Sequence, residues 1–236
     1  MATVADSTIL ITGANRGIGR ALVDEALARG ARRVYAGTRT PFTHSDPRVV
    51  PLTLEVTDAD AVRAAAETIP ELDILVNNAG IAQFDDLSDA ATIQRHLDVN
   101  LFGPHTVIHA FLPQLTAAKG AIVNNLSMNS LAPIPFVPAY SVSKAAAFSL
   151  TQSLRALLGG RDVSVHAVLT GPVDTDMSRE FQVPKATPAA VAQAIFDGVE
   201  KGEEDIFPDP LSAQSADGWR TSGMKALERE FAALAS

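Results

Sequence analysis

The chain has 236 residues, of which 47% are hydrophobic and 19% charged, with a net charge of −8 and no cysteine. This composition excludes an intrinsically disordered chain, and the absence of thiols excludes disulfides, a cysteine nucleophile and cysteine-ligated metal sites. Nucleic-acid-binding proteins usually carry a basic surface, so we expect no nucleic-acid partner. No apolar run is long enough for a signal segment or a membrane span, so we expect a cytoplasmic protein without a membrane partner.

Short apolar runs rich in Val, Ile and Leu alternate along the chain with longer, alanine-rich amphipathic stretches. In chain order, the runs predict strands at 7–12, 32–38, 49–56, 72–77, 121–126 and 163–169. The stretches predict helices at 17–29, 58–68, 88–100, 101–118, 140–158 and 188–200, and a partly helical segment at 212–233. Buried strands separated by helices predict an α/β fold, with one doubly wound parallel sheet, helices on both faces, and a single domain over 1–236. Such sheets bind ligands beyond the carboxyl ends of their strands, so we expect function in the loops that follow the strands.

Three glycines follow the first predicted strand, where Gly13, Gly17 and Gly19 are spaced as Gly-x3-Gly-x-Gly. Glycines permit a tight turn and let backbone N–H groups approach a pyrophosphate, to which the next helix presents its positive N-terminus. The alternative is an ordinary strand-to-helix turn, in which one or two glycines are common. Three glycines in the first such turn of an α/β chain favour a dinucleotide site.

The second predicted strand ends in Thr38-Arg39, without the carboxylate that bonds a ribose 2′-hydroxyl in NAD-binding folds. Arg39 stands there instead, and Arg16 lies within the glycine loop. Two guanidinium groups can hold a 2′-phosphate through charge-assisted hydrogen bonds, although both side chains can also be merely solvated. The residues therefore favour NADP over NAD.

Tyr140 and Lys144 lie four residues apart on a predicted helix, so their side chains share one face. A free tyrosine has a pKa near 10, and a neighbouring ammonium group lowers that pKa by favouring the phenolate. The alternative is a surface pair in which the lysine extends to solvent. The position of the pair, after an apolar strand and a proline-rich loop, favours a catalytic role.

Five ordered segments resemble the short-chain dehydrogenase/reductase family in its compact single-domain form, over the chain from Thr12 to about Pro210. They are Thr12-Gly13-x3-Gly17-x-Gly19, Asn77-Asn78-Ala79-Gly80, Asn100, Ser127 thirteen residues before the tyrosine, and Tyr140-x3-Lys144. The resemblance implies a Rossmann-type fold and hydride transfer between a nicotinamide and a carbonyl or carbinol carbon. With Arg39, the segment Gly13-Ala14-Asn15-Arg16 resembles the NADPH-preferring carbonyl reductases of the family.

The resemblance also implies the catalytic roles. Tyr140 would donate a proton to the developing alkoxide, and Lys144 would lower the pKa of Tyr140 and hold the nicotinamide ribose. Ser127 would hydrogen-bond the substrate oxygen, unless it only caps the strand end and Ser130 is the active serine. Asn100 would position a water that relays protons to Lys144, unless it merely ends a helix.

The NADP(H) site implied by the resemblance draws on several loops. Its expected residues are Gly13, Asn15, Arg16, Gly17, Ile18, Gly19, Arg39, Glu55, Val56, Asn78, Ala79, Gly80, Tyr140, Lys144, Val173 and Thr175. Two positions depart from the family pattern. The family's Pro-Gly after the sixth strand is Thr170-Gly171 here, which implies a softer turn, and its aspartate near the adenine is Glu55.

The loops expected to line the substrate pocket are mostly apolar. Their candidate substrate residues are Phe84, Met128, Phe136, Met177 and Phe181. We expect residues 170–187 to form a short substrate lid and 208–236 a C-terminal cap. The substrate is expected to be a small apolar or aromatic ketone, aldehyde or secondary alcohol, although the apolar residues can equally serve to pack the lid.

Other polar groups favour plainer interpretations. His105 and His109 lack a third ligand, so no metal site is expected, and Asp85-Asp86 and 203–205 are predicted to be solvated loop ends. The resemblance implies a homodimer or homotetramer that pairs through the helices at 101–118 and 140–158. Two other functions stay open, namely a 3-oxoacyl thioester reductase and a non-catalytic NADP-binding regulator.

Overall fold

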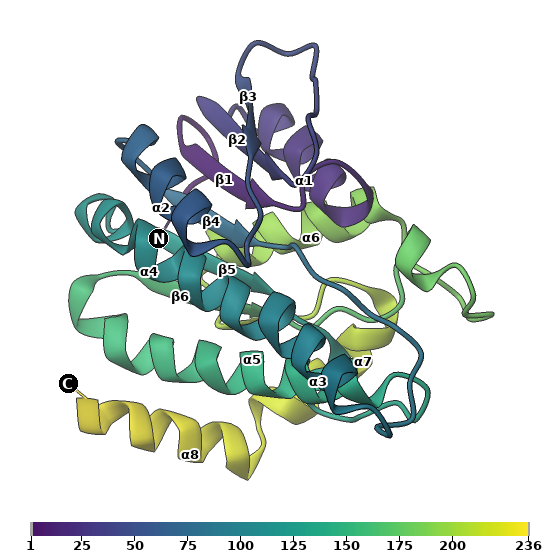
Figure 1. Cartoon of the computed structure of the whole chain (residues 1–236). Helices are drawn as coiled ribbons and strands as arrows, with labels where there is room; N and C mark the ends of the chain where they lie inside the picture. The colour runs from purple at the N-terminus through teal and green to yellow at the C-terminus, as the bar shows by residue number, and fades with distance from the viewer. Residues whose placement is uncertain (1, 236) are drawn as a thin grey trace.

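Seven parallel strands form one sheet in the computed structural model, which describes residues 2–235 (Figure 1). The strands are β1 (Thr8–Thr12), β2 (Arg33–Thr38), β3 (Val49–Thr53), β4 (Ile74–Asn77), β5 (Ala121–Asn125), β6 (Ser164–Val168) and β7 (Asp205–Ile206). Their order across the sheet is β3-β2-β1-β4-β5-β6-β7, and every neighbouring pair is parallel. The predicted α/β class and doubly wound parallel sheet are confirmed.

Helices cover both faces of the sheet because successive strand residues point to opposite sides. The helices are α1 (Gly17–Ala28), α2 (Ala59–Thr68), α3 (Ala90–Leu97), α4 (Gly103–Ala118), α5 (Pro138–Leu158), α6 (Pro188–Glu200), α7 (Pro210–Arg220) and α8 (Gly223–Ala232). On β1, Ile9 and Ile11 pack into the core beneath α1 and α6, whereas Leu10 packs beneath α2, α4 and α5. The apolar alternation of the strands thus builds two cores, one on each face.

The helical stretch from 90 to 118 contains a π-helical turn at Asp98–Phe102, between α3 and α4. Pro104 follows that turn and has no N–H to donate to the preceding turn of an α-helix, so the backbone widens there. The two helices predicted at 88–100 and 101–118 are therefore present, but they are joined by a turn that carries Asn100.

The strand predicted at 49–56 ends at Thr53, because its partner β2 ends at Thr38, the residue opposite Thr53. Val56 then turns inward against Gly103, where an added Cβ would lie 2.9 Å from a Val56 methyl group. The sequence also gave no signal for β7, which has only two residues and begins with an aspartate.

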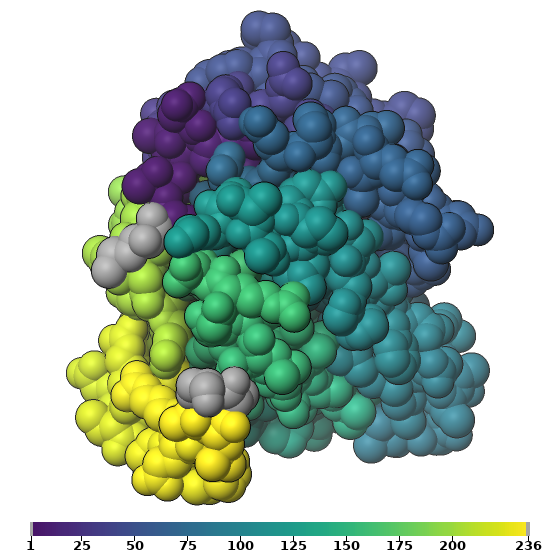
Figure 2. Space-filling view, turned by 90° about the vertical axis from the view of Figure 1, so that its left-hand side faces the viewer, coloured from purple at the N-terminus to yellow at the C-terminus, as the bar shows by residue number. Residues whose placement is uncertain are grey.

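Two helices, α7 and α8, form the C-terminal region, which was predicted to be only partly helical. Helix α8 runs alongside α5 in Figure 1, and Figure 2 shows the C-terminal segment packed directly against the α5 region on one face of the molecule. Gln152 Nε2 of α5 donates to Glu228 Oε2 of α8 at 2.9 Å, which joins the two helices.

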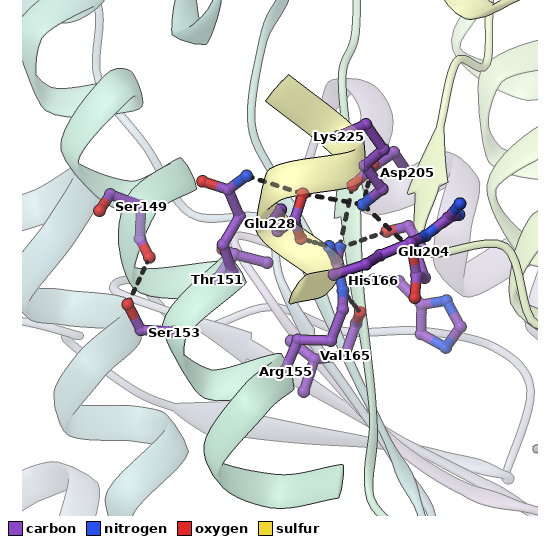
Figure 3. Close-up of polar contacts among 12 residues, drawn as sticks. Ser149, Thr151, Ser153, Arg155, Val165, His166, Glu204, Asp205, Lys225 and Glu228 are labelled. Carbon is purple, nitrogen blue, oxygen red and sulfur yellow. Dashed lines mark hydrogen bonds and ion pairs between the residues drawn. The ribbon is translucent and has the colours of Figure 1, made fainter. Parts of the chain in front are cut away.

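A buried ionic cluster fixes these helices to the edge of the sheet (Figure 3). Asp205 of β7 accepts from Arg155 at 2.9 Å, from Lys225 at 2.7 Å and from the Trp219 indole at 2.8 Å. Lys225 also contacts Glu228 at 2.9 Å, and the side chains of Lys225 and Asp205 are only 1% and 2% exposed. Burial alone raises the pKa of the Asp205 carboxyl, but the Arg155 and Lys225 charges outweigh burial and leave that pKa below its usual value. The prediction that residues 203–205 form a solvated loop end is therefore wrong at Asp205.

Among residues 2–235, no helix combines the length and the apolar character that a membrane crossing requires.

Candidate active site

The glycine loop joins the end of β1 to α1 at the centre of the sheet. Gly13 and Gly17 have φ angles of +66° and +52°, which disfavour residues with a Cβ. A Cβ on Gly19 would lie 2.1 Å from the Gly13 carbonyl oxygen, so this position also requires glycine. No side chain caps the N-terminus of α1. Its first N–H groups therefore face the loop without a side-chain acceptor, as a pyrophosphate site requires.

Asn78, in the loop after β4, holds the glycine loop in place. Its Nδ2 donates to the carbonyl oxygens of Thr12 and Gly13 at 3.0 and 3.2 Å. The backbone N–H groups of Asn78 and Ala79 both donate to the Thr12 hydroxyl at 3.0 Å. The Asn-Asn-Ala-Gly segment therefore lies against the glycine loop.

Tyr140 and Lys144 lie on the first turns of α5, facing the end of β5. The Lys144 ammonium lies 5.6 Å from the centre of the Tyr140 ring and donates to the Asn125 carbonyl oxygen at 2.7 Å. The Ser127 side chain acts on the Tyr140 phenol and lowers its pKa, so Ser127 is the serine beside the tyrosine. Among the described residues, the buried hydroxyl of its competitor Ser130 has no hydrogen-bond partner.

The pKa of Tyr140 differs from the sequence expectation. Burial raises this pKa to about 12, and the hydrogen bond with Ser127 only partly opposes the rise. Burial also lowers the pKa of Lys144 to about 8. The Lys144 ammonium donates to the Asn125 carbonyl oxygen, and burial is the largest influence on the pKa of the phenol. The expected lowering of the Tyr140 pKa by Lys144 is therefore not found.

These pKa shifts predict how stability depends on pH. Between about pH 8 and pH 10.5 the unfolded chain holds a proton on Lys144 that the folded chain has lost. The unfolded state then binds more protons, so the free energy of unfolding should rise with pH across this window, by up to about 3 kcal/mol. Above pH 10 the folded chain keeps the Tyr140 proton that the unfolded chain loses, so Tyr140 lowers the free energy of unfolding as the pH rises. Urea titrations at fixed ionic strength measure the effect, and a Lys144→Met variant should lack the rise; a rise that persists in this variant contradicts the assignment to Lys144.

Asn100 lies buried in the π-helical turn and clamps the loop after β4. Its Nδ2 donates to the Ile81 carbonyl oxygen and to the Ser143 hydroxyl, each at 2.9 Å, and its Oδ1 accepts from the Ile81 N–H at 2.9 Å. Since these bonds cross from the turn to α5 and to the loop, Asn100 does more than end a helix.

Arg16 and Arg39 extend from separate loops, with 66% and 68% of their side chains exposed. Arg16 Nη1 lies 3.3 Å from Asp176 Oδ2, and Arg39 Nε lies 3.9 Å from Glu55 Oε2. The two guanidinium groups therefore have separate acidic partners in this structure.

The candidate substrate residues lie in three segments, namely the loop after β4, the segment between β5 and α5, and the segment between β6 and α6. The rings of Phe84 and Phe181 lie 5.6 Å apart between centroids, and Phe84, Phe136 and Met177 are all exposed. A bridge between Val173 and Ala186 joins the two ends of the expected lid segment. The structure thus brings the loop after β4 and the 170–187 segment together at Phe84 and Phe181.

Asp85 was predicted to be solvated, and that prediction is wrong. Its carboxylate accepts from the Ala139 N–H at 3.2 Å, at the start of α5, where the N-cap residue Val137 offers no side-chain acceptor. A carboxylate is stabilising at the positive end of a helix. The residue that precedes Tyr140 is therefore held by the loop that carries Phe84.

Thr170-Gly171, which stands where the family pattern has Pro-Gly, is held by polar contacts. The Thr170 hydroxyl donates to Asn125 Oδ1 at 2.9 Å, and the Gly171 N–H donates to Asp209 Oδ2 at 2.7 Å. The turn is thus held by polar side chains from β5 and from the N-cap of α7, rather than by a proline. Sequence reasoning did not single out Asn125 or Asp209, because each acts through partners far away in the chain.

Comparisons with known proteins agree with this geometry. A family model described as short chain dehydrogenase matches residues 7–185. Among curated proteins, the short-chain dehydrogenase srdE of Neurospora crassa is 35% identical over 189 residues, which cover 75% of this chain and 64% of that protein. The short-chain dehydrogenase virD of Hypocrea virens is 35% identical over 71% of this chain and 62% of its own length. The chain thus spans less than two thirds of these two relatives.

Solved structures extend the likeness over nearly the whole chain. A short chain dehydrogenase from Burkholderia cenocepacia in complex with NADP has a TM-score of 0.88 and 33% identity, over 97% of this chain and 98% of that one. An NADPH-bound carbonyl reductase from chicken fatty liver has a TM-score of 0.76 and 27% identity, over 83% of this chain and 88% of that one. The chain therefore belongs to the short-chain dehydrogenase family and has its Rossmann-type fold.

Proposed function

We propose that the protein is an oxidoreductase that transfers a hydride between NADP(H) and the carbonyl or secondary alcohol carbon of a small apolar or aromatic substrate. The observation that carries this proposal is the grouping of Tyr140, Lys144 and Ser127 at the strand ends next to the glycine loop, with the Lys144 ammonium 5.6 Å from the centre of the Tyr140 ring. A 3-oxoacyl thioester reductase has less support, because no cluster of basic residues lines the candidate substrate loops. A non-catalytic regulator has less support because both Tyr140 and Lys144 are present.

The residues present fit a dinucleotide. The glycine loop leaves no space for a Cβ at Gly19, and the N-terminus of α1 is free of a side-chain cap. The backbone N–H groups of this loop would hold the pyrophosphate, and Arg39 with Arg16 would hold the 2′-phosphate. Val173 and Thr175 would contact the nicotinamide amide, and Glu55 with Val56 would lie at the adenine. NADPH, when bound, supplies the hydride.

The protein's own residues would manage the proton and the substrate oxygen. Because its pKa lies near 12, Tyr140 is fully protonated at neutral pH and can donate its proton to the developing alkoxide. Ser127 would donate to that oxygen, and the positive charge of Lys144 would stabilise the resulting phenolate. The phenolate would then regain a proton from the Lys144 ammonium, and Lys144 would recover its own proton through a water positioned by Asn100.

The pocket and assembly are part of the same proposal. Phe84, Met128, Phe136, Met177 and Phe181 would surround an apolar substrate, with 170–187 as lid. Pairing of copies as a homodimer or homotetramer is supported by the exposed apolar side chains of Phe102 and Val142, on the helices expected to pair. Light scattering of the purified protein tests the assembly, and a cytoplasmic location stays a prediction.

The test is NADPH oxidation, followed by absorbance, with a panel of apolar and aromatic ketones and aldehydes and with NADH in parallel. Turnover with NADPH supports the proposal. Tight NADPH binding with no turnover on any panel member favours the regulator, and turnover restricted to 3-oxoacyl thioesters favours the other enzyme.

Cofactor preference gives a separate prediction. An Arg39→Ala variant should raise KM for NADPH by about tenfold while changing KM for NADH little, since it removes one charge-assisted phosphate contact. Arg63→Ala is the matched control, because Arg63 is also an exposed arginine with one acidic neighbour, Asp60 at 2.8 Å, but lies on α2. Equal losses with both cofactors contradict the role of Arg39.

A further inference from the structure

Asn125, the last residue of β5, joins neighbouring strands through its side chain. Its Oδ1 accepts from the Thr170 hydroxyl, which follows β6, and its Nδ2 donates to Asn78 Oδ1, which follows β4. Both distances are 2.9 Å, as expected for well-formed hydrogen bonds. The amide is thus held from both sides at the centre of the sheet's carboxyl edge.

The same hydrogen-bond chain continues to the glycine loop. Asn78 Nδ2 donates to the Thr12 and Gly13 carbonyl oxygens at 3.0 and 3.2 Å. Every donor in the chain points the same way, from Thr170 through Asn125 and Asn78 to the backbone of the loop. Hydrogen bonds aligned in this manner polarise and strengthen one another.

The backbone of Asn125 holds a different group. Its carbonyl oxygen accepts from Lys144 Nζ at 2.7 Å, so the place of the ammonium depends on the place of this peptide. The side chain of the same residue fixes that peptide through its two hydrogen bonds. One residue therefore links Lys144 to the loop expected to bind pyrophosphate.

We propose that Asn125 is a positioning residue, which couples the placement of the Lys144 ammonium to the glycine loop and so supports cofactor binding. This inference rests on the function proposed above. The first donor in this row of hydrogen bonds is the Thr170 hydroxyl. The family resemblance leads one to expect a proline at this position, and a proline has no hydroxyl to donate. The link is therefore built from residues particular to this chain.

The test compares Asn125→Leu, Thr170→Val and their double variant with the unaltered protein. Asn125→Leu removes two side-chain hydrogen bonds and should raise the Kd for NADPH about tenfold, measured by calorimetry. Thr170→Val removes one and should raise it about threefold. Because both changes break the Thr170–Asn125 bond, the double variant should bind no more weakly than Asn125→Leu alone, rather than about thirtyfold more weakly than the unaltered protein.

Thr8→Val is the matched control. Thr8 is a buried threonine whose hydroxyl accepts from Arg32 at 3.1 Å, at the opposite end of the strands. The Thr8→Val variant should lower the free energy of unfolding by a similar amount to Thr170→Val, without changing the Kd for NADPH. This comparison separates a loss of positioning from a general loss of stability.

A second readout needs no cofactor. The pKa of Lys144, followed by NMR of the protein with isotope-labelled lysine, should fall in Asn125→Leu, because a less well-placed carbonyl favours the ammonium less. Thr8→Val should leave it unchanged. An unchanged Lys144 pKa in Asn125→Leu overturns the proposal, as does an unchanged Kd or a fully additive double variant. If the unaltered protein does not bind NADPH, the proposed function fails, and the Lys144 pKa alone decides the role of Asn125.

Discussion

Replacing Tyr140 with phenylalanine is expected to lower kcat for carbonyl reduction by about 10²–10⁴-fold, the usual contribution of a positioned general acid. The substitution removes only the hydroxyl on which Ser127 acts and leaves the ring beside Lys144. NADPH affinity should change little, since the proposed role of the lost oxygen is at the substrate. Steady-state kinetics and calorimetry on the same preparation measure the two quantities.

The only other tyrosine provides the control for this substitution. Tyr35 is a buried residue of β2, so Tyr35→Phe makes the same chemical change away from the proposed reaction. It should keep kcat within about threefold of the unaltered protein, as expected of a conservative change outside the active site. A Tyr140→Phe variant that keeps its turnover would remove Tyr140 from the mechanism.

Replacing Lys225 with methionine should lower the free energy of unfolding by about 3–5 kcal/mol, the cost of removing one partner from a buried ion pair. Lys225 is almost fully buried and contacts Asp205 at 2.7 Å, so the variant leaves a buried carboxylate with one cation fewer. Urea denaturation measures the loss, which should appear as a lower midpoint with an unchanged slope.

Lys119→Met is the corresponding surface control. The Lys119 ammonium contacts Asp162 at 2.8 Å, but its side chain is 70% exposed. Exposed ion pairs contribute about 0–1 kcal/mol, so this variant should unfold at nearly the same urea concentration as the unaltered protein. Equal effects of the two substitutions would show that burial of Lys225 does not determine its contribution.

The sequence predicted the sheet well because its signals are local. Strands such as Thr8–Thr12 are continuous apolar runs, and their buried character is visible without knowledge of their neighbours. The glycine loop, the Asn-Asn-Ala-Gly segment and the Tyr-Lys pair are likewise short motifs. The structure brings them to one edge of the sheet, as parallel strands require.

The missed features depend on partners that are distant in the sequence. Asp205 follows two glutamates and resembles a solvated loop, but it is buried because Arg155 and Lys225 reach it from α5 and α8. Asp85 likewise has no sequence signal for its contact with Ala139, 54 residues away. A charged residue read alone predicts solvation, and only the tertiary fold supplies its counterion or its helix end.

The Tyr140 pKa could not be predicted for a related reason. A four-residue spacing places Lys144 on the correct face, yet the burial of the phenol decides the sign of the shift in its pKa. Here the ammonium bonds the Asn125 carbonyl, and desolvation dominates.

The two edge strands of the sheet, β3 and β7, affect how the protein behaves at high concentration. One edge strand, β3, contains Pro51, which cannot donate a backbone hydrogen bond, and the other, β7, has only two residues. An open strand edge is a template for aggregation, and proline and short edge strands both oppose such pairing. Expression at high level should therefore favour soluble protein over aggregates linked through their strand edges. A Pro51→Val variant, which restores a backbone donor to β3, should aggregate more readily.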